Sequence, residues 1–221
     1  MGQTIVITGA NRGIGLAMVQ AWCARGDTVL ATCREPSAAL LESGATVIDS
    51  VDVSTADGVM NLQNALGDRR VDMLYNNAGI MSSETVDGMN FDSIRDQFEV
   101  NTLGPLRVTM ALLGNLHAGS KVGLMTSRMG SIADNTSGAR YGYRASKAAL
   151  NAVGKSLAVD LSERGIAVAI LHPGWVQTDM TRHSGNLTVD EAAAGLIARM
   201  DALNLENSGT FWHSDGSVLP W

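Results

Sequence analysis

Short apolar segments alternate with helical patterns along the chain, and this alternation restricts the folds that it can adopt. The predicted strands lie at residues 3–8, 28–33, 45–51, 71–75, 121–126, 166–171 and 210–212. Helical spacing of apolar residues occupies residues 14–25, 56–66, 91–113, 143–161 and 189–203. Strands that are apolar throughout are buried on both faces, with crossover helices covering them. We therefore predict an α/β fold with a doubly wound parallel sheet of the Rossmann type and about seven strands.

The size and composition fit one globular domain. The chain has 221 residues, of which 45% are hydrophobic and 17% are charged, so it can bury a sizeable core. No repeat with a period of about 20 to 50 residues divides it, and we predict a single domain over residues 1–221. The net charge is -6 and there is no run of lysine or arginine. A nucleic acid partner is therefore not expected, because neutralising phosphates requires a basic surface.

The cysteine and histidine residues show no metal or disulfide pattern. Cys23 and Cys33 lack the paired spacing of either, and the four histidines are not spaced as ligands. We predict two buried thiols and no metal site. The first strand begins close to Met1, and no apolar run reaches the ~18 residues needed to cross a bilayer. We therefore expect a cytoplasmic protein with no membrane partner.

A glycine motif follows the first predicted strand and opens the first helix. It reads Thr8-Gly9-Ala10-Asn11-Arg12-Gly13-Ile14-Gly15. Gly9 would permit a tight turn, Gly13 would let the backbone approach a pyrophosphate, and Gly15 would let the helix pack closely on the strand. The free N–H groups at the start of a helix favour anionic phosphates. Residues 9 and 11–14 are thus the predicted phosphate-binding loop of a dinucleotide site.

The end of the second strand predicts which dinucleotide is bound. An acidic residue about 20 residues after the glycine motif is typical of NAD binding, but the strand here ends in Cys33 followed by Arg34. Arg34 and Arg12 are positioned to converge on a 2′-phosphate, which a guanidinium group binds well. NADP(H) is therefore the preferred cofactor. NAD(H) stays an alternative, because Glu35 would reach the ribose if the strand shifted by one residue.

Small and polar residues after three other strands complete the predicted cofactor site. They are Asp52 and Val53 after the third strand, Asn77, Ala78 and Gly79 after the fourth, and Pro173, Gly174, Val176 and Thr178 after the sixth. Asp52 would accept a hydrogen bond from the adenine amino group, and Ala78-Gly79 would let backbone lie against the adenosine. The Val176 backbone and the Thr178 hydroxyl would hold the nicotinamide carboxamide.

Tyr143 and Lys147 are the predicted centre of the chemistry. They stand one helical turn apart, so their side chains share a face. An ammonium group near a phenol favours the ionised form and lowers the phenol pKa, which moves it toward the range useful in acid–base catalysis. Tyr141 is the weaker candidate, because the residue four positions later, Ala145, carries no charge. The sequence predicts Tyr143 as a general acid.

Two further residues are predicted to act beside the tyrosine. Ser127 follows the fifth strand, where its hydroxyl can donate to a substrate carbonyl; Ser131 and Thr126 are the alternatives. Pro105 has no N–H, so the helical hydrogen bond to the carbonyl of Asn101 cannot form. That carbonyl could hold a water that relays protons to Lys147. His172 also follows a strand, but we expect it to pack beside the strand end.

Taken together, these motifs resemble the short-chain dehydrogenase/reductase family over nearly the whole chain. Arg34, residues 128–132, His172-Pro-Gly-Trp175 and Leu219-Pro-Trp221 are similar to its C-factor and sniffer-like carbonyl reductase branch. The resemblance implies NADPH-dependent reduction of a small carbonyl substrate, or oxidation of the matching alcohol. It implies that Ser127 polarises the carbonyl, Tyr143 donates the proton, Lys147 holds the ribose and Asn101 positions the relay water. It also implies a homodimer, or a homotetramer, formed by helices 91–113 and 143–161.

Two alternatives to this interpretation stay open. The first is a non-enzymatic protein that senses NADP(H) or takes part in signalling on the same fold, because a fold does not by itself imply an activity. The second is an NAD-dependent alcohol dehydrogenase. The set Asn101, Ser127, Tyr143 and Lys147 favours an enzyme, since a sensor would not need it.

Overall fold

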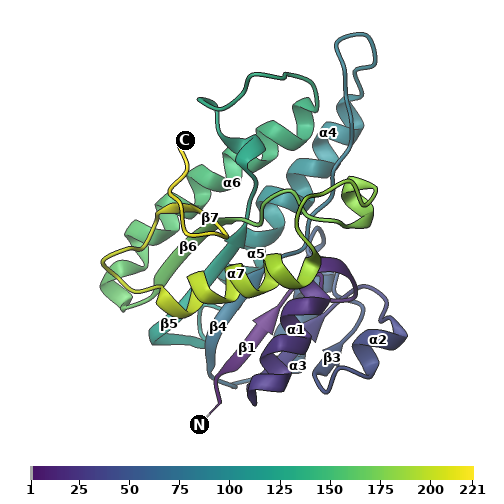
Figure 1. Cartoon of the computed structure of the whole chain (residues 1–221). Helices are drawn as coiled ribbons and strands as arrows, with labels where there is room; N and C mark the ends of the chain where they lie inside the picture. Colours follow the sequence, from purple (N-terminus) through teal and green to yellow (C-terminus); the bar gives the residue numbers. More distant parts are fainter. Residues whose placement is uncertain (1) are drawn as a thin grey trace.

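A computed structural model of the protein describes residues 2–221 and has a seven-stranded sheet between two layers of helices (Figure 1). All neighbouring strands are parallel, in the order β3-β2-β1-β4-β5-β6-β7. The strands are β1 (Thr4–Ile7), β2 (Thr28–Thr32), β3 (Thr46–Ile48), β4 (Val71–Asn76), β5 (Leu116–Met125), β6 (Ala167–His172) and β7 (Phe211–His213). The predicted doubly wound parallel fold is confirmed.

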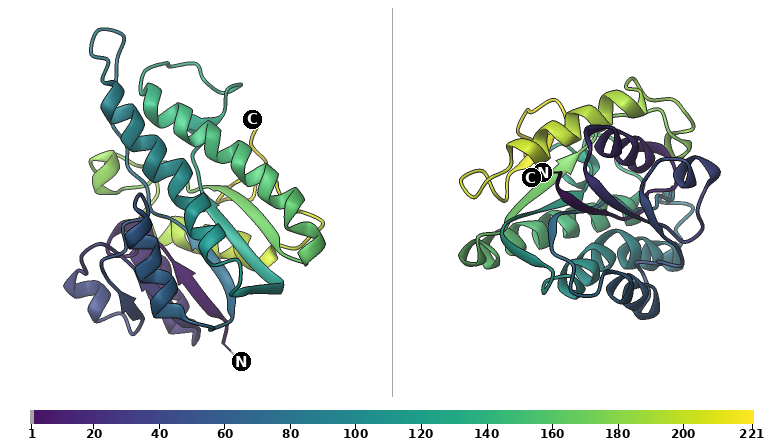
Figure 2. Two further views of the ribbon diagram at one scale, coloured as in Figure 1. Left: turned by 180° about the vertical axis from the view of Figure 1, so that it is seen from behind. Right: turned by 90° about the horizontal axis from the view of Figure 1, so that it is seen from below.

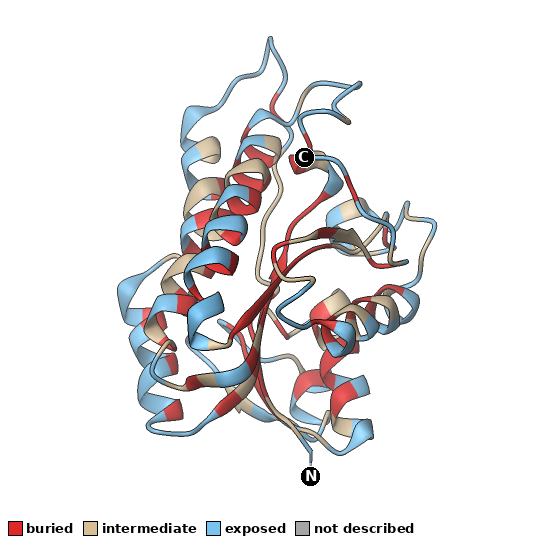
Figure 3. Ribbon diagram, turned by 90° about the vertical axis from the view of Figure 1, so that its left-hand side faces the viewer, coloured by how far each residue is buried: buried red, intermediate tan, exposed pale blue. Residues whose placement is uncertain are grey.

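Helices cover both faces of the sheet, as Figure 2 shows from behind and from below. The helices are α1 (Gly13–Arg25), α2 (Ala38–Leu41), α3 (Ala56–Leu66), α4 (Phe91–Phe98), α5 (Gly104–Ala111), α6 (Tyr141–Asp160) and α7 (Val189–Ala202). Helices α1, α2 and α7 bury one apolar cluster around Trp22 and Met200, while α3, α5 and α6 bury another around Leu62 and Leu150. Figure 3 shows the central strands as buried ribbon between these layers. The buried strands explain why their sequences are continuously apolar.

The strand order reverses between β1 and β4, which are neighbours in the sheet although β2 and β3 lie between them in the chain. In such a sheet the crevice beyond the carboxyl ends of these strands is where ligands bind. The glycine motif follows β1 and residues 77–79 follow β4. The fold thus brings two of the predicted cofactor segments to one crevice.

The helical pattern over residues 91–113 forms three pieces instead of the single helix predicted. Between α4 and α5 lies a π-helical turn, Glu99–Leu103. The turn precedes Pro105, whose ring cannot donate the i→i+4 hydrogen bond. In the π turn the hydrogen bonds run from i to i+5, and the Gly104 N–H donates to the Glu99 carbonyl accordingly. Pro105 therefore does more than bend this helix. It directly follows a turn that contains one residue more than an α-helical turn.

The other differences concern the ends of predicted elements and short elements that were not predicted. β5 begins at Leu116, ahead of the predicted residue 121, because a register shift between Val71 and Met73 lets the strand continue past the irregularity. β3 is shorter than residues 45–51, and α6 begins two residues before Tyr143. The short helix α2 and three 3-10 turns, Arg128–Gly130, Ser162–Arg164 and Asp179–Thr181, were not predicted. None of these changes moves a predicted site residue away from a strand end.

Candidate active site

The glycine motif forms a tight loop between β1 and α1. Gly9 and Gly13 have φ angles of 66° and 56°, which side chains other than glycine rarely adopt. A Cβ at Gly9 would lie 2.8 Å from the Ala78 Cα, and one at Gly15 would lie 2.5 Å from the Gly9 carbonyl oxygen. The loop therefore packs against the segment after β4 in a way that only glycine allows.

The start of α1 suits an anion. Its N-cap residue, Arg12, makes no side-chain cap, and the first turn contains no acidic residue. The N–H groups that a helix leaves unpaired at its start, together with the helix dipole, favour a phosphate at this position. The residues present thus fit the pyrophosphate of a dinucleotide.

Thr8 and Asn77 join the glycine loop to the segment after β4. The Thr8 hydroxyl oxygen accepts hydrogen bonds from the backbone N–H groups of Asn77 and Ala78, both at 3.1 Å. The Asn77 amide donates to the carbonyls of Thr8 and Gly9 at 3.1 and 2.9 Å. In this structure Asn77 therefore holds the glycine loop in place through hydrogen bonds. Ala78 and Gly79 present backbone to the crevice.

Arg12 lies in an ion pair across the crevice, which sequence reasoning did not predict. Its guanidinium group donates to the Asp179 carboxylate at 2.8 Å, and both side chains are exposed. The two loops also approach at Gly13, where a Cβ would lie 3.6 Å from the Thr178 methyl group. We expected Arg12 and Arg34 to converge. The ion pair disfavours this arrangement, because it holds Arg12 toward the segment after β6.

Arg34 and Asp52 lie close enough for their charges to interact. The charge of Arg34 contributes to lowering the pKa of Asp52, although the largest cause is the hydrogen bond from the Ser54 hydroxyl. That hydroxyl donates at 2.6 Å to the same carboxylate oxygen that accepts the Ser54 N–H at 2.9 Å. The Val53 side chain is buried against Gly104, so only its backbone is available to a cofactor. Asn11 donates weakly to the Glu35 carbonyl at 3.4 Å.

Tyr143, Lys147 and Ser127 meet at the carboxyl end of β5. Tyr143 and Lys147 are buried on α6, and the Lys147 Nζ lies 5.8 Å from the centre of the tyrosine ring. The same Nζ donates to the Met125 carbonyl at 2.7 Å. Ser127 is also buried; its hydroxyl oxygen accepts the Met129 N–H at 3.1 Å, and the side chain lies close enough to Tyr143 to act on the pKa of the phenol. These three groups thus form one cluster, as spacing on α6 and position after β5 predicted.

The pKa directions in this cluster differ from the expectation. Burial raises the pKa of Tyr143, and the nearby Ser127 side chain and the charge of Arg140 oppose this only in part. Burial also lowers the pKa of Lys147 to about 7. The prediction that the ammonium lowers the phenol pKa is therefore wrong for the protein alone, because burial raises the pKa of the phenol and makes the ammonium itself easier to deprotonate.

Asn101 lies in the π-helical turn and is fully buried beside Lys147. Its side chain accepts the Ile80 N–H and donates to the Ile80 carbonyl, both at 2.8 Å, and it donates to the Ser146 hydroxyl at 3.1 Å. A Cβ at Gly79 would lie 3.2 Å from the Asn101 Oδ1 and 3.5 Å from the Lys147 Nζ. Asn101 therefore ties the segment after β4 to α6, and Gly79 leaves open the space next to the lysine.

The rival residues named from the sequence have other partners. The Ser131 hydroxyl donates to the Trp221 carbonyl at 3.0 Å, and the Thr126 hydroxyl donates to Asn151 at 2.7 Å. Tyr141 is exposed. Burial, the largest cause, lowers the pKa of His172 to about 3, so His172 is neutral near pH 7 and packs edge-on against His213 with the ring centres 5.0 Å apart. These contacts favour Ser127 and Tyr143 over their rivals.

The segment after β6 turns back toward the glycine loop. Gly174, after Pro173, has a φ of 93°, and a Cβ there would lie 2.6 Å from a methyl carbon of Leu187. The Val176 carbonyl accepts the Thr181 hydroxyl at 2.6 Å, and the Thr178 N–H donates to the same hydroxyl at 3.1 Å. Val176 and Thr178 are therefore held in a fixed turn opposite Gly13.

A polar cavity of about 550 Å³ opens beyond the ends of β6 and β7. Its lining includes Arg128, the residue after Ser127, and also His172, Trp175, Glu191, His213 and Asp215. The cavity thus offers a guanidinium group, two imidazoles and two carboxylates. The sequence had no signal for it, since its residues come from four separate segments.

Among residues 2–221, no group of three or more histidine, cysteine or acidic side chains is arranged to hold a metal ion. Over the same residues no helix is long and apolar enough to cross a membrane. Cys23 and Cys33 are both free thiols; Cys33 is buried as predicted, whereas Cys23 is only partly buried.

Comparison with known proteins gives consistent matches. Residues 3–187 match the short chain dehydrogenase family. The chain is 44% identical over 225 residues to 1-hydroxy-2-glutathionyl-2-methyl-3-butene dehydrogenase of Rhodococcus sp. (strain AD45), covering 99% of each chain. It superposes on the carbonyl reductase Sniffer of D. melanogaster with a TM-score of 0.90 and 31% identity, and on a carbonyl reductase from Pseudomonas aeruginosa PAO1 in complex with NADP with a TM-score of 0.88 and 34% identity. Both structures and the chain are covered completely.

The buried lysine predicts how stability changes with pH. The pKa of Lys147 is about 7 in the folded protein against an ordinary value of 10.5, so between these values the unfolded chain binds one more proton, and the free energy of unfolding rises with pH. We expect the ligand-free wild type to gain stability relative to Lys147→Met as the pH rises from about 7 to about 10. Urea unfolding of both proteins across this range measures the difference. A difference that stays constant with pH would contradict the burial of a neutralised lysine.

Proposed function

This chain belongs to the short-chain dehydrogenase family, and we propose that it is an NADP(H)-dependent oxidoreductase that reduces a small carbonyl compound with Tyr143 as the proton donor. The observation that carries the proposal is the buried cluster of Tyr143, Lys147 and Ser127 beyond the end of β5. It lies at the same sheet edge as a glycine loop shaped for a pyrophosphate. The resemblance to the carbonyl reductase branch is borne out by the match to Sniffer.

The cofactor assignment rests on the crevice and on the relatives. The start of α1, with Gly9, Gly13 and backbone of residues 77–79, would hold the pyrophosphate and adenosine. Arg34 is exposed and near Asp52, where it would bind a 2′-phosphate as a charged hydrogen-bond donor. Val176 and Thr178 would hold the nicotinamide end. NADP is bound in the Pseudomonas aeruginosa reductase, which supports NADP(H) for this chain also.

Three side chains would carry out the proton chemistry. When bound, the nicotinamide supplies a hydride for the carbonyl carbon. The Ser127 hydroxyl would donate a hydrogen bond to the carbonyl oxygen, and the Tyr143 hydroxyl would transfer its proton to that oxygen. Lys147 would bind the ribose and stabilise the phenolate that Tyr143 leaves behind. Asn101 would keep the lysine and the Gly79 segment in place, through the hydrogen bonds that it makes to Ile80 and Ser146.

Tyr143→Phe tests the assigned proton donor. The variant keeps the ring packing and loses only the hydroxyl, so we expect NADPH binding to be unchanged and kcat for a panel of aldehydes and ketones to fall by about 100-fold or more. Steady-state kinetics and NADPH titration measure the two quantities. Tyr141→Phe is the matched control, because Tyr141 is exposed on the same helix. A wild type that reduces no member of the panel would favour a cofactor-sensing protein, and a variant as active as wild type would remove Tyr143 from the mechanism.

Arg34→Ala tests the preference for NADP(H). Loss of a charged hydrogen bond to the 2′-phosphate is expected to weaken NADPH binding relative to NADH by about 10-fold to 100-fold. The two dissociation constants, measured by titration before and after the substitution, give this ratio. Arg95→Ala removes an equal charge from an exposed ion pair on α4 and should leave the ratio unchanged. An unchanged ratio in Arg34→Ala would count against NADP(H) selection by this residue.

A second candidate is oxidation of an alcohol that carries a glutathionyl arm. It is favoured by the polar cavity lined by Arg128, the residue after Ser127, together with the 44% identity to a dehydrogenase whose name specifies a glutathionyl alcohol. A glutathionyl group carries both carboxylates and an ammonium group. The cavity presents Arg128 on one hand and Glu191 and Asp215 on the other, so it offers partners of both signs. Hydride and proton would then move in the reverse direction through the same residues.

Matched substrates separate the two candidates. If the cavity binds the arm, kcat/KM with NADP should be about 10-fold or more higher for an S-glutathionyl alcohol than for the same alcohol with an S-methyl group. Arg128→Ala should reduce this ratio, because it removes the guanidinium partner. Equal kcat/KM values for the two alcohols would discard the second candidate and leave simple carbonyl compounds as the substrates.

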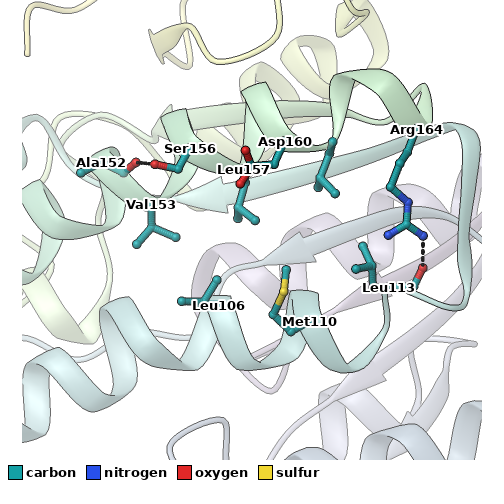
Figure 4. Close-up of a pocket in the computed structure, with 10 residues that line it drawn as sticks. Leu106, Met110, Leu113, Ala152, Val153, Ser156, Leu157, Asp160 and Arg164 are labelled. Atoms are coloured by element: carbon teal, nitrogen blue, oxygen red, sulfur yellow. Dashed lines mark hydrogen bonds between the residues drawn. The ribbon is translucent and has the colours of Figure 1, made fainter.

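The proposal extends to a homodimer through α5 and α6. A groove of about 530 Å³ runs between these helices and is lined mainly by apolar side chains, among them Leu106, Met110, Val153 and Leu157 (Figure 4). Ala152 and Ser156, one turn apart on α6, are small enough to let a second copy's helix approach closely. The mass in solution decides this point: one copy has 23.2 kDa, and a protein that stays at that mass at micromolar concentration is no dimer.

A cytoplasmic location is part of the same proposal. Cys23 and Cys33 are free thiols in separate elements, and free thiols are typical of proteins in a reducing compartment. Cell fractionation with a tagged chain tests it.

A further inference from the structure

Glu84 is a buried carboxylate held by hydrogen bonds from two helices. Its Oε1 accepts the Ser93 hydroxyl at 2.9 Å and the Gln97 amide at 2.7 Å, both on α4. Its Oε2 accepts the Gly142 N–H on α6 at 3.2 Å. No salt bridge within residues 2–221 includes it. A buried charge without an ionic partner is costly unless hydrogen bonds compensate it. The three hydrogen bonds to the Glu84 carboxylate therefore indicate that this residue has a specific role in the structure.

Helix α6 lacks a cap of its own. Its N-cap residue, Arg140, has a φ of 51° and makes no side-chain cap, and the first turn contains no acidic residue. Glu84 supplies what is missing from a segment 58 residues earlier, since its carboxylate accepts the Gly142 N–H and its carbonyl accepts the Arg140 N–H at 2.8 Å. A negative charge at the start of a helix is also favourable to the helix dipole.

The contact between α4 and α6 is close at this point. A Cβ at Gly142 would lie 2.4 Å from the Gln97 Nε2 and 3.0 Å from the Ile94 Cα, so α6 begins pressed against α4. The two helices run side by side at the upper end of the molecule in Figures 1 and 2. The Gln97 Oε1 in turn accepts the Ser82 N–H at 3.0 Å. Glu84 and Gln97 therefore join residues 80–90, α4 and α6 in one hydrogen-bonded unit.

Tyr143 is the residue next to Gly142 and lies in this first turn of α6. The position of its hydroxyl relative to Ser127 depends on the position of the turn, because the side chain is attached to a backbone that α6 itself does not cap. Burial alone would raise the pKa of Glu84, but the hydrogen bonds from Ser93, its own backbone, Gly142 and Gln97 outweigh burial and lower it. The carboxylate is therefore ionised near pH 7.

We propose that Glu84 is a positioning residue for the proton donor: by capping α6 from the loop after β4, its carboxylate fixes the first turn of that helix and with it the Tyr143 hydroxyl. The inference rests on the proposed function, since it concerns the residue to which that function assigns the proton transfer. Glu84 itself touches neither Tyr143 nor, by position, the reacting atoms. Its effect passes through the Gly142 backbone.

Glu84→Gln tests the role of the carboxylate at nearly constant volume. The site presents three donors to Glu84, from Ser93, Gln97 and Gly142, and an amide would turn its NH2 group toward at least one of them. We expect kcat to fall by about 10-fold to 100-fold, as displacement of a reacting group by a fraction of an ångström to 1 Å does. The dissociation constant of NADPH should change by less than about 2-fold. Amide hydrogen exchange should accelerate at Gly142 and Tyr143.

The exchanged pair Glu84→Gln with Gln97→Glu provides the rescue. The amide at position 84 can then accept the Gly142 N–H and donate to the new carboxylate at position 97, whose other oxygen can take the Ser82 N–H. Most of the lost kcat and of the lost protection at Gly142 should return. Ser93→Ala, which removes one of the three donors, is a milder variant in case Glu84→Gln does not fold, and it should shift both readouts in the same direction.

Ser120→Ala is the control for a general loss of stability. Ser120 is buried toward the amino end of β5, away from the site at the carboxyl ends of the strands. It donates to the Val71 carbonyl at 2.7 Å and accepts the His117 N–H at 2.9 Å. It should lower the free energy of unfolding and leave kcat and exchange at Gly142 unchanged. The proposal is overturned if Glu84→Gln retains wild-type kcat and exchange, or if Ser120→Ala lowers kcat equally. If the wild type reduces no substrate, the proposed function fails, and exchange at Gly142 alone then decides whether Glu84 fixes the turn.

Discussion

The parallel pairing of β1 with β4 is the constraint on which the site depends. Parallel strands all end at the same edge of a sheet, so every segment that follows a strand emerges on one side of the molecule. The hydroxyl of Thr8 and the amide of Asn77 then join the first two of these segments directly. The site is thus assembled from residues that are far apart in sequence, first by the backbone pairing of β1 with β4 and then by the side chains of Thr8 and Asn77.

The parts of the structure set by local patterns could be predicted from the sequence. Strands and helices follow from apolar spacing, and Gly9 follows from the tight turn that a strand needs before it enters a helix. Tyr143 and Lys147 share a face because four residues make about one helical turn. The place of Ser127 follows from its strand. These features depend on a few neighbouring residues, and the predicted fold and family were confirmed because such features recur along almost the entire chain.

Features that depend on distant partners could not be predicted. Arg12 pairs with Asp179, which lies 167 positions away, and nothing near Arg12 announces it. No pattern near Glu84 marks that residue, because its acceptor role is visible only when α4 and α6 are packed together. The pKa of Lys147 likewise depends on distant residues. The sequence spacing places Lys147 next to Tyr143, but the direction of its pKa shift is set by burial under β5 and the surrounding segments. Electrostatic predictions from sequence fail where desolvation competes with attraction.

The π turn at Glu99–Leu103 has a consequence for helix packing. One additional residue in a helix rotates everything after it by about 100°, so α4 and α5 direct their apolar stripes differently although they form one rod. This change of phase lets α4 lie along α6 while α5 lies along α3. A straight α-helix of the same sequence would present its apolar face to only one of these two helices. The inserted residue therefore turns the apolar face of α5 away from that of α4, so that each helix packs on a different neighbour. Asn101 lies at the point where the direction of the apolar face changes.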